Sequence, residues 1–386
     1  MRNWEKNVRK VVPYVPGEQP KRKDIIKLNT NENPYPPSPK VAEAMKGMTA
    51  DNMRKYPDPA CEILIQAIAG EYGVKPQQVF AGVGSDDVLA MAFMTFFNSD
   101  KPILFPDITY SFYDVWADLF RIPYECQPLN EDFEIVKEDY YKENGGVIFP
   151  NPNAPTGALL ELEAVEDIIR HNQDVIVIVD EAYIDFGGAS ALDLIEKYDN
   201  LLVVQTFSKS RSMAGMRIGY AFGNEALIRY LNDVKYSFNS YTMNDTALKL
   251  GAAAVEDHEY FAETCRKIIA TREHAKEELK RLGFSFADSR ANFIFAAHES
   301  ADAKELFEAL KEEGIYVRYF NKPRISNYLR ITIGTDEQME QLFAFLKNYL
   351  NRLNERRPLY GQGASGKYPE KSESANDSDK FTRIQL

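Results

Sequence analysis

The sequence predicts an α/β protein with a three-layer α/β/α large domain around a mostly parallel sheet, followed by a smaller α+β domain. Short, near-continuous apolar runs alternate with longer helical patterns, which is typical of strands buried on both faces by covering helices. A long helical stretch then leads to a second, shorter set of runs and helices. With 386 residues the chain is too long for one small core. We expect residues 41–270 to form the large domain and residues 271–352 the small one.

The expected elements follow in chain order. Residues 1–40, rich in proline and polar groups, form an N-terminal arm rather than a packed element. Strands of the large domain are expected at 79–84, 102–106, 146–150, 175–180, 201–207 and 218–223. A helical stretch over 244–282 leads to strands at 292–298, 315–320 and 328–334, with helices at 301–313 and from 336 onwards. Residues 353–386 are polar, charged and poor in aliphatic side chains, which predicts a disordered tail.

Composition excludes several classes of function. The net charge of -12 argues against nucleic-acid binding, which needs clustered basic surface. No apolar run approaches the roughly 20 residues that span a bilayer, and the N-terminus has no apolar segment typical of a secretion signal. The three cysteines and four histidines are scattered, so we expect no disulfide framework and no metal site. We therefore expect a cytoplasmic protein that binds neither nucleic acid nor membrane.

The segment TFSKSRSMAGMRIG, residues 206–219, carries the strongest chemical signal. It places Lys209 at the end of a buried strand, with Ser208 before it and Arg217 after it. Partial burial near cations favours a neutral lysine amine, which can form a Schiff base. Serine and arginine are the groups that bind a phosphate. This combination suggests pyridoxal phosphate, although most lysines at strand ends are simply solvated.

Asp180 ends the strand VIVIVD and is followed by Tyr183. A carboxylate at the carboxyl end of a central strand faces the crevice in which α/β sheets bind ligands. Asp180 would pair with a protonated pyridine nitrogen, and Tyr183 would reach the ring hydroxyl of the cofactor. The plain structural alternative is a helix-capping carboxylate beside a packing tyrosine.

Two turns complete the pattern. In GVGSDD, Gly84 allows close approach of the backbone, and the amides of Ser85 and Asp86 open a helix that would attract an anion. The loop NPNAPTG, residues 151–157, holds polar side chains between two prolines. An ordinary capped helix and a plain turn are the alternatives for these two segments.

Together these motifs resemble the class I and II pyridoxal-phosphate aminotransferases. GSDD, TYSFY, NPNxPTG, DEAY, SK, the later arginine and YLRITIG occur in the order found in that family. PYVPG, LNTNENPY and RKYPDP are similar to marks of the subgroup that acts on histidinol phosphate. The resemblance covers about residues 8–351. It implies the fold of the fold-type-I pyridoxal-phosphate transferases and a homodimer.

The resemblance also implies a set of site residues. The catalytic residues would be Lys209, Asp180 and Tyr183, with Lys209 as the Schiff-base lysine. The cofactor-binding residues would be Gly84, Ser85, Asp86, Tyr110, Asn153, Asp180, Tyr183, Ser208, Lys209, Arg217 and Tyr56 of the partner subunit. The substrate-binding residues would be Tyr14, Asn33, Asn239, Arg318 and Arg330. Arg330 would hold the substrate α-carboxylate with its bidentate guanidinium.

Two residues depart from the simple pattern. Many relatives place asparagine directly before Pro-Thr-Gly, whereas this chain has Ala154 there and Asn153 one position earlier. Either Asn153 contacts the ring hydroxyl after a small backbone adjustment, or Tyr183 makes that contact alone. Arg211 lies between Lys209 and Arg217, and we expect it to face solvent.

The predicted activity is transamination between L-histidinol phosphate and 2-oxoglutarate, giving imidazole-acetol phosphate and L-glutamate in histidine biosynthesis. The partners would be a small-molecule amino donor, a 2-oxo acid acceptor and a second copy of the chain. Three alternatives remain: an aromatic amino-acid aminotransferase, a pyridoxal-phosphate decarboxylase of a phosphorylated amino acid, and a cofactor-binding module without activity. The last of these is disfavoured by the presence of Lys209, Asp180 and Arg330.

Overall fold

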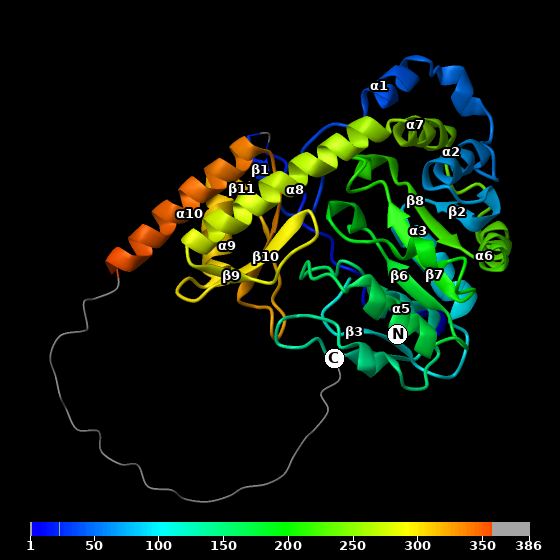
Figure 1. Ribbon diagram of the computed structural model, residues 1–386, viewed down its shortest axis with the longest axis horizontal. Coiled ribbons are helices and arrows are strands. Elements are labelled where there is room, and N and C mark those ends of the chain that lie inside the picture. The colour runs from blue at the N-terminus through cyan, green and yellow to red at the C-terminus, as the bar shows by residue number, and fades with distance from the viewer. Residues whose placement is uncertain (1, 23, 357–386) are drawn as a thin grey trace, which may run out of the picture.

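A computed structural model describes residues 2–22 and 24–356. A large sheet of seven strands is covered by helices on both faces, and a small sheet of four strands lies beside it, as Figure 1 shows. The fold is therefore the three-layer α/β architecture with an added α+β part that the sequence predicts. Residues 357–386, most of the predicted tail, lie outside the described residues. Within the described residues, no helix is both long and apolar enough to cross a bilayer.

The strands of the large sheet are β2 (Val79–Gly82), β3 (Ile103–Pro106), β4 (Tyr124–Gln127), β5 (Gly146–Pro150), β6 (Val177–Asp180), β7 (Leu201–Thr206) and β8 (Gly219–Gly223). Their order is β2-β8-β7-β6-β5-β3-β4. Only β8 runs antiparallel to its neighbours, so β3 to β7 all end at the same edge. Polar residues that follow these strands are thereby gathered at one edge of the sheet.

The helices are α1 (Pro39–Lys46), α2 (Glu62–Tyr72), α3 (Ser85–Phe96), α4 (Tyr113–Phe120), α5 (Leu162–His171), α6 (Glu225–Phe238), α7 (Asp245–Val255), α8 (His258–Arg281), α9 (Ala303–Glu313) and α10 (Asp336–Arg356). Alternate strand residues enter two different cores, which lie on opposite faces of the large sheet. Val177 and Val179 belong to one core, and Ile178 and Leu202 belong to the other. Burial on both faces explains why these strands read as continuous apolar runs.

The small sheet has the order β12 (Arg318–Tyr319), β13 (Tyr328–Thr332), β10 (Phe293–His298) and β9 (Phe284–Phe286). Two further strands, β1 (Ile26–Lys27) and β11 (Ile315–Tyr316), pair in parallel. The expected strand 315–320 is thus two short strands in different sheets. The N-terminal arm also contributes β1, so part of it is a packed element, contrary to the expectation from its composition.

The expected helical stretch 244–282 consists of two helices, α7 and α8, which are separated at Glu256 and Asp257. Asp257 caps α8 through the backbone N–H of Tyr260 and also accepts a hydrogen bond from the Ser38 hydroxyl. Helix α8 crosses the expected domain boundary at residue 270 and runs toward the small sheet (Figure 1). The division into domains at 270 and 271 remains a prediction.

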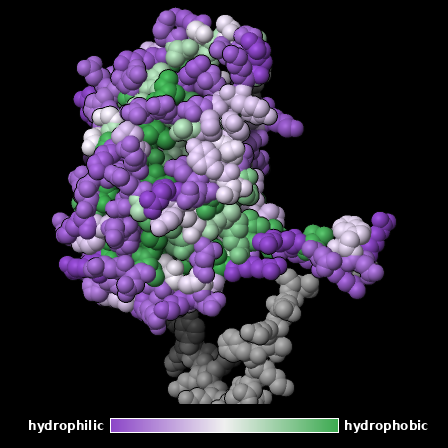
Figure 2. All heavy atoms as spheres, turned by 90° about the vertical axis from the view of Figure 1, so that its right-hand side faces the viewer, coloured by the Kyte–Doolittle hydropathy of each residue, from purple (hydrophilic) through white to green (hydrophobic). Residues whose placement is uncertain are grey.

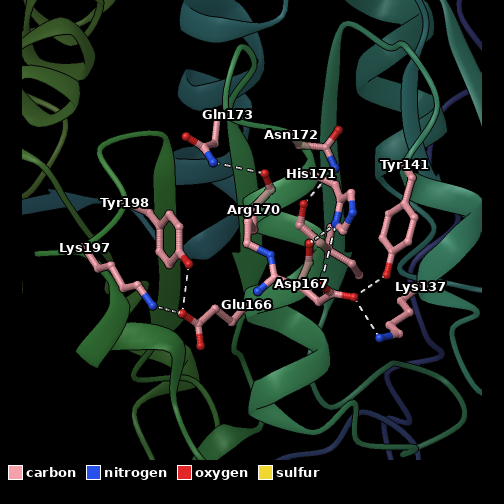
Figure 3. Close-up of polar contacts among 11 residues, drawn as sticks. Lys137, Tyr141, Glu166, Asp167, Arg170, His171, Asn172, Gln173, Lys197 and Tyr198 are labelled. Carbon is pink, nitrogen blue, oxygen red and sulfur yellow. Dashed lines mark hydrogen bonds and ion pairs between the residues drawn. The ribbon is translucent and has the colours of Figure 1, made fainter.

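A polar cluster on α5 lies apart from the strand ends, and Figure 3 shows how its side chains converge. Asp167 accepts hydrogen bonds from Lys137, at 2.7 Å, and from Tyr141. The Lys137 ammonium holds the pKa of Asp167 well below its usual range. The ring of His171 stacks on Tyr141 with 3.8 Å between ring centres. These contacts tie α5 to the segment 137–141, and we assign the cluster a structural role.

Candidate active site

Two adjoining cavities lie at the carboxyl ends of β6 and β7. The Asp180 cavity, of about 240 Å³, is lined by Ser85, Asp86, Asp180, Ser208 and Arg217 among others. The Arg330 cavity, of about 160 Å³, is lined by Tyr14, Arg318 and Arg330 among others. Both cavities are lined by Thr30, Tyr110, Ala154, Tyr183 and Lys209. Lys209 therefore lines both the Asp180 cavity, which contains Ser85, Ser208 and Arg217, and the Arg330 cavity, which contains Arg318 and Arg330.

Lys209 follows the end of β7, and its amine lies between the arm and Tyr183. The amine Nζ donates to the carbonyl of Thr30 at 3.1 Å and lies 5.6 Å from the centre of the Tyr183 ring. The Asn33 side-chain amide donates to the carbonyls of Lys209 and Ser210, each at 3.1 Å. Asn33 therefore positions the backbone of the lysine turn, and it is not among the residues that line either cavity.

Asp180, at the end of β6, is a buried carboxylate for which no ion pair is found among the described residues. Its Oδ2 accepts a hydrogen bond from the Tyr113 hydroxyl at 2.8 Å, whereas its Oδ1 is buried and has no partner. Burial raises the pKa of Asp180 to about 6, although the Tyr113 hydrogen bond opposes that rise. A cationic N–H donor bound at Oδ1 would satisfy this oxygen and favour the ionised form.

Tyr183 and Asn153 differ in their access to the cavities. Tyr183 lines both, and its hydroxyl oxygen accepts a hydrogen bond from the Asn31 amide at 2.9 Å. The Asn153 amide instead donates to the Ile108 carbonyl at 3.0 Å and to the Thr156 hydroxyl at 2.9 Å. Ala154 occupies the cavity wall, while Asn153 lines neither cavity. The structure thus favours the alternative in which Tyr183 contacts a ring hydroxyl without Asn153.

Arg217 and the start of α3 form the cationic corner of the Asp180 cavity. Arg217 donates to Asp86 at 2.8 Å and to the Ser208 hydroxyl at 3.4 Å, and Tyr110 donates to Asp86 at 2.6 Å. Gly84 has φ +85°, and a Cβ at this position would lie 2.4 Å from Arg217 Nη2. Glycine therefore lets the guanidinium lie against the turn that opens the helix. Together, the helix N-terminus and the arginine can bind an anion.

The two arginines of the Arg330 cavity come from the small sheet. Arg330 on β13 donates to the Asn29 carbonyl at 3.1 Å, and its Nε is buried without a partner. Burial lowers the pKa of Arg330 from its usual value, yet a guanidinium remains charged at neutral pH. Arg318 approaches the Val15 carbonyl at 3.5 Å, and Tyr14 stacks on Phe112 with 4.1 Å between ring centres. This cavity can hold a ligand with two anionic groups.

Besides Gly84, Asn33 and Asn153, two further predicted site residues are not among those that line the cavities. Tyr56 is 83% exposed and packs against Tyr241, with 4.7 Å between ring centres. Asn239 is exposed at the C-terminal end of α6. Neither residue lines a cavity of its own chain in this structure.

The expectation that Arg211 faces solvent is wrong. Its side chain is buried, its Nη1 donates to the Ala254 carbonyl at 3.2 Å, and its guanidinium lies 4.1 Å from the centre of the Phe261 ring. The alternating pattern of SKSRS gives no sign of this burial, because the helices that cover Arg211 come from residues far along the chain.

Several residues that contact the site escape the sequence analysis, among them Thr30, Asn31 and Tyr113. Thr30 acts through its carbonyl, which no side-chain pattern reveals. Asn31 lies in the arm segment NTNEN, where Asn33 is the residue singled out from the sequence. Tyr113 opens α4, and nothing in the sequence marks its contact with Asp180.

The residues present fit pyridoxal phosphate. The unpartnered Oδ1 of Asp180 could accept from a pyridine N–H, the Lys209 amine could bind an aldehyde, and Arg217 with the start of α3 could hold a phosphate. Within the part of the chain that the structure describes, no group of three or more His, Cys, Asp or Glu side chains could hold a metal ion. Fold and site together define the class of the protein, a fold-type-I transferase built around a lysine.

Comparison with known proteins identifies the family. The family model "Aminotransferase class I and II" matches residues 23–346. Histidinol-phosphate aminotransferase of Lactococcus lactis subsp. cremoris MG1363 is 52% identical over 348 residues, which cover 90% of this chain and 98% of the relative. Histidinol-phosphate aminotransferase of Pseudomonas putida KT2440 is 55% identical over 341 residues, covering 88% and 98%.

A solved structure shows the same fold. The histidinol-phosphate aminotransferase of Sinorhizobium meliloti, in complex with pyridoxal-5'-phosphate, has a TM-score of 0.78 at 22% identity and covers 85% of this chain and 91% of that one. The chain belongs to the class I and II aminotransferases and, within them, to the histidinol-phosphate aminotransferase family.

Proposed function

We propose that the protein binds pyridoxal phosphate at Lys209 and transfers the amino group of L-histidinol phosphate to 2-oxoglutarate. The observation that carries the proposal is the position of Lys209, which lines both the Asp180 cavity and the Arg330 cavity. One cavity offers groups for the cofactor, and the other offers Arg318 and Arg330 for the phosphate of L-histidinol phosphate and for the two carboxylates of 2-oxoglutarate. The identity of 52–55% to histidinol-phosphate aminotransferases supports this choice of substrate.

The residues that line the two cavities have distinct proposed roles in this reaction. Bound pyridoxal phosphate would supply an aldehyde that captures amines and a ring that withdraws electrons. The Lys209 amine would take the proton from the substrate Cα and return a proton on the way to product. Arg330 would orient the carboxylate next to the reacting carbon of L-glutamate and 2-oxoglutarate through paired hydrogen bonds. Arg318 and Tyr14 would face the substrate phosphate.

The proposal is tested by comparing amino donors with 2-oxoglutarate as the acceptor. We expect L-histidinol phosphate to exceed phenylalanine and L-histidinol by at least about 10³-fold in kcat/KM, because a missing phosphate leaves buried donors unpaired. A preference for phenylalanine would instead identify an aromatic aminotransferase. Release of carbon dioxide from a phosphorylated amino acid, without formation of glutamate, would identify the decarboxylase.

Covalent labelling gives an independent test of the lysine. Borohydride reduction of the protein with bound pyridoxal phosphate should fix the cofactor on Lys209, which mass spectrometry of tryptic peptides would locate. Labelling of any other lysine contradicts the assignment.

We further propose a cytoplasmic homodimer in which Tyr56 of the partner subunit completes each site. Large apolar side chains around this segment are exposed, including Met53, Tyr56, Phe238 and Tyr241. The packing of Tyr56 on Tyr241 places this segment beside the chain that follows α6, in which Asn239 also lies. Figure 2 views the right-hand side of Figure 1 and shows apolar areas between hydrophilic margins on that face. Exposed apolar groups of this kind are typical of surfaces that bind another protein.

A further inference from the structure

Tyr113 is held rigidly against Asp180. Its side chain is fully buried at the start of α4, and its hydroxyl donates to Asp180 Oδ2 at 2.8 Å. The ring packs among other aromatic rings, those of Phe93, Phe105, Tyr110 and Trp116. Because these rings surround it, the Tyr113 side chain is tightly packed, and the hydrogen bond to Asp180 satisfies its buried hydroxyl.

The two oxygens of Asp180 are consequently different. Oδ2 is occupied by the Tyr113 hydroxyl, whereas Oδ1 is buried and has no hydrogen-bond partner. Asp180 lines its cavity, so the unpartnered oxygen is the one available to a ligand. The hydrogen bond from Tyr113 thus selects which oxygen can receive a donor.

Several groups influence the charge of Asp180 from the elements packed around it. Burial disfavours the ionised carboxylate most, and Asp86 on α3 acts in the same direction. The Tyr113 hydroxyl, the backbone N–H of Ala182 and the Lys209 ammonium favour ionisation. Among these groups Tyr113 is an uncharged side chain, so replacing it alters the hydrogen bond to Asp180 without changing the charges of Asp86 and Lys209.

We propose that Tyr113 is a positioning residue of the cofactor site, which keeps Asp180 ionised and directs Oδ1 toward the pyridine nitrogen of bound pyridoxal phosphate. The inference rests on the proposed function, since it requires that this cofactor binds in the Asp180 cavity. Tyr113 contacts Asp180 rather than the reacting atoms, so its effect passes through the carboxylate.

The substitution Tyr113→Phe tests this role with little change in volume. Loss of a hydrogen bond to a charged group corresponds to about a 10- to 100-fold change in an equilibrium constant. Asp180 would then ionise at a pH higher by about one to two pH units. Because a protonated pyridine needs an ionised partner, cofactor affinity should fall at a higher pH in Tyr113→Phe than in the wild type. At pH 7 we expect cofactor binding to be about 2- to 10-fold weaker, with recovery toward wild-type affinity near pH 9.

The measurement is titration of the apoenzyme with pyridoxal phosphate between pH 5.5 and 9, followed by quenching of tryptophan fluorescence. Trp116 packs against Tyr110 and Tyr113, so it reports binding in this cavity without any turnover. Tyr140→Phe is the matched control, because the Tyr140 hydroxyl is buried without a hydrogen-bond partner and lines neither cavity. Its pH profile should superimpose on that of the wild type.

A second arm keeps the test decisive. In an Asp180→Asn background, Tyr113→Phe should no longer shift the pH profile, since the ionisable partner is gone. If Tyr113→Phe in the native background also leaves the profile unchanged, the role of Tyr113 is overturned. If the wild-type protein fails to bind pyridoxal phosphate at any pH, the proposed function itself fails.

Discussion

Asp180 makes the protein without cofactor less stable as the pH rises. Its pKa is raised from 3.8 to about 6 in the folded state by burial, so the folded state binds more protons than the unfolded state between these values. Stability is therefore lost as the pH rises from about 4 to about 6, and the loss persists above that range. Asp180→Asn removes the ionisation.

We expect the Asp180→Asn apoprotein to exceed the wild type in unfolding free energy at pH 8 by up to about 3 kcal/mol. The difference should shrink at pH 5, where Asp180 is largely protonated when folded. Urea unfolding of both apoproteins at the two pH values checks this. A difference that is independent of pH would mean that burial of the charge is not its origin.

Gly84 is where a single methyl group should damage the anion site. Alanine at φ +85° is strained, and its Cβ would meet Arg217 Nη2 at 2.4 Å. We expect Gly84→Ala to lower the unfolding free energy by about 1–3 kcal/mol and to weaken pyridoxal phosphate binding.

Gly70→Ala is its control. Gly70 lies within α2, and a Cβ there would meet nothing within 4 Å. This variant should gain about 0.5–1 kcal/mol and bind cofactor normally. Equal affinity of both variants for pyridoxal phosphate would show that the Gly84 turn does not hold the phosphate.

Lys209 is the residue on which turnover should depend most. Lys209→Ala should retain the fold, because the contacts of its amine among the described residues are limited to the Thr30 carbonyl and the face of Tyr183. We expect kcat to fall at least about 10³-fold, since proton transfer by a placed base is lost. A steady-state assay with L-histidinol phosphate measures this, with circular dichroism as the check on folding. Activity within tenfold of the wild type would exclude Lys209 as the base.

Individual site residues were predictable where the side chain itself does the chemistry. Lys209, Asp180 and Arg217 follow or flank strands that read clearly in the sequence, and the structure brings all three to one cavity. Tyr113 and the burial of Arg211 were not predictable in this way. Their partners lie on elements far along the chain, so only the folded arrangement reveals the contacts.

At the scale of elements, burial decides what the sequence could predict. Central strands such as β6 are apolar on both faces, so a simple run of valine and isoleucine marks them. The strand β4 was missed because it forms an edge of the large sheet and is mostly exposed, with no apolar run. The break between α7 and α8 was missed because Glu256 and Asp257 are common within helices as well as between them.

Helix α10 bears on where the chain can be shortened. It extends through Arg356, so the first four residues of the predicted tail, 353–356, are helical, and Leu353 packs against the core of the small sheet. We expect a chain ending at residue 356 to keep its melting temperature and activity, since the residues beyond have little apolar content.

A chain ending at residue 352 should melt a few degrees lower, because it loses the contacts of Leu353. Thermal unfolding of the full chain and both truncated forms distinguishes the contributions. A lower melting temperature for the chain ending at 356 would reveal a packing role for residues 357–386.

The whole molecule can be tested for shared sites by mixing two inactive variants. Subunits with Lys209→Ala are combined with subunits with Tyr56→Ala. In a mixed dimer, the chain with intact Lys209 would receive intact Tyr56 of the partner subunit, and the other site would stay inactive. With random exchange, half the dimers are mixed and half their sites work, so about one quarter of native activity should return.

The control is each variant alone, which should remain nearly inactive after the same treatment. Exchange between subunits is followed with a mass-tagged chain. If exchange is complete, Tyr56→Ala alone is impaired and activity does not return, then Tyr56 serves its own chain.

Helix α8 packs against both parts of the molecule, and it therefore connects the walls of the two cavities. One end is tied to the side of the large sheet through Asp257 and Ser38, and its other half packs in the core of the small sheet, which carries Arg330. Midway along it, the buried Arg272 donates to the carbonyls of Phe186 and Ala291, at 2.7 and 3.0 Å. Phe186 ends the short helical turn that follows Tyr183. A tilt of this helix would therefore displace Arg330 and the wall beside Lys209 together.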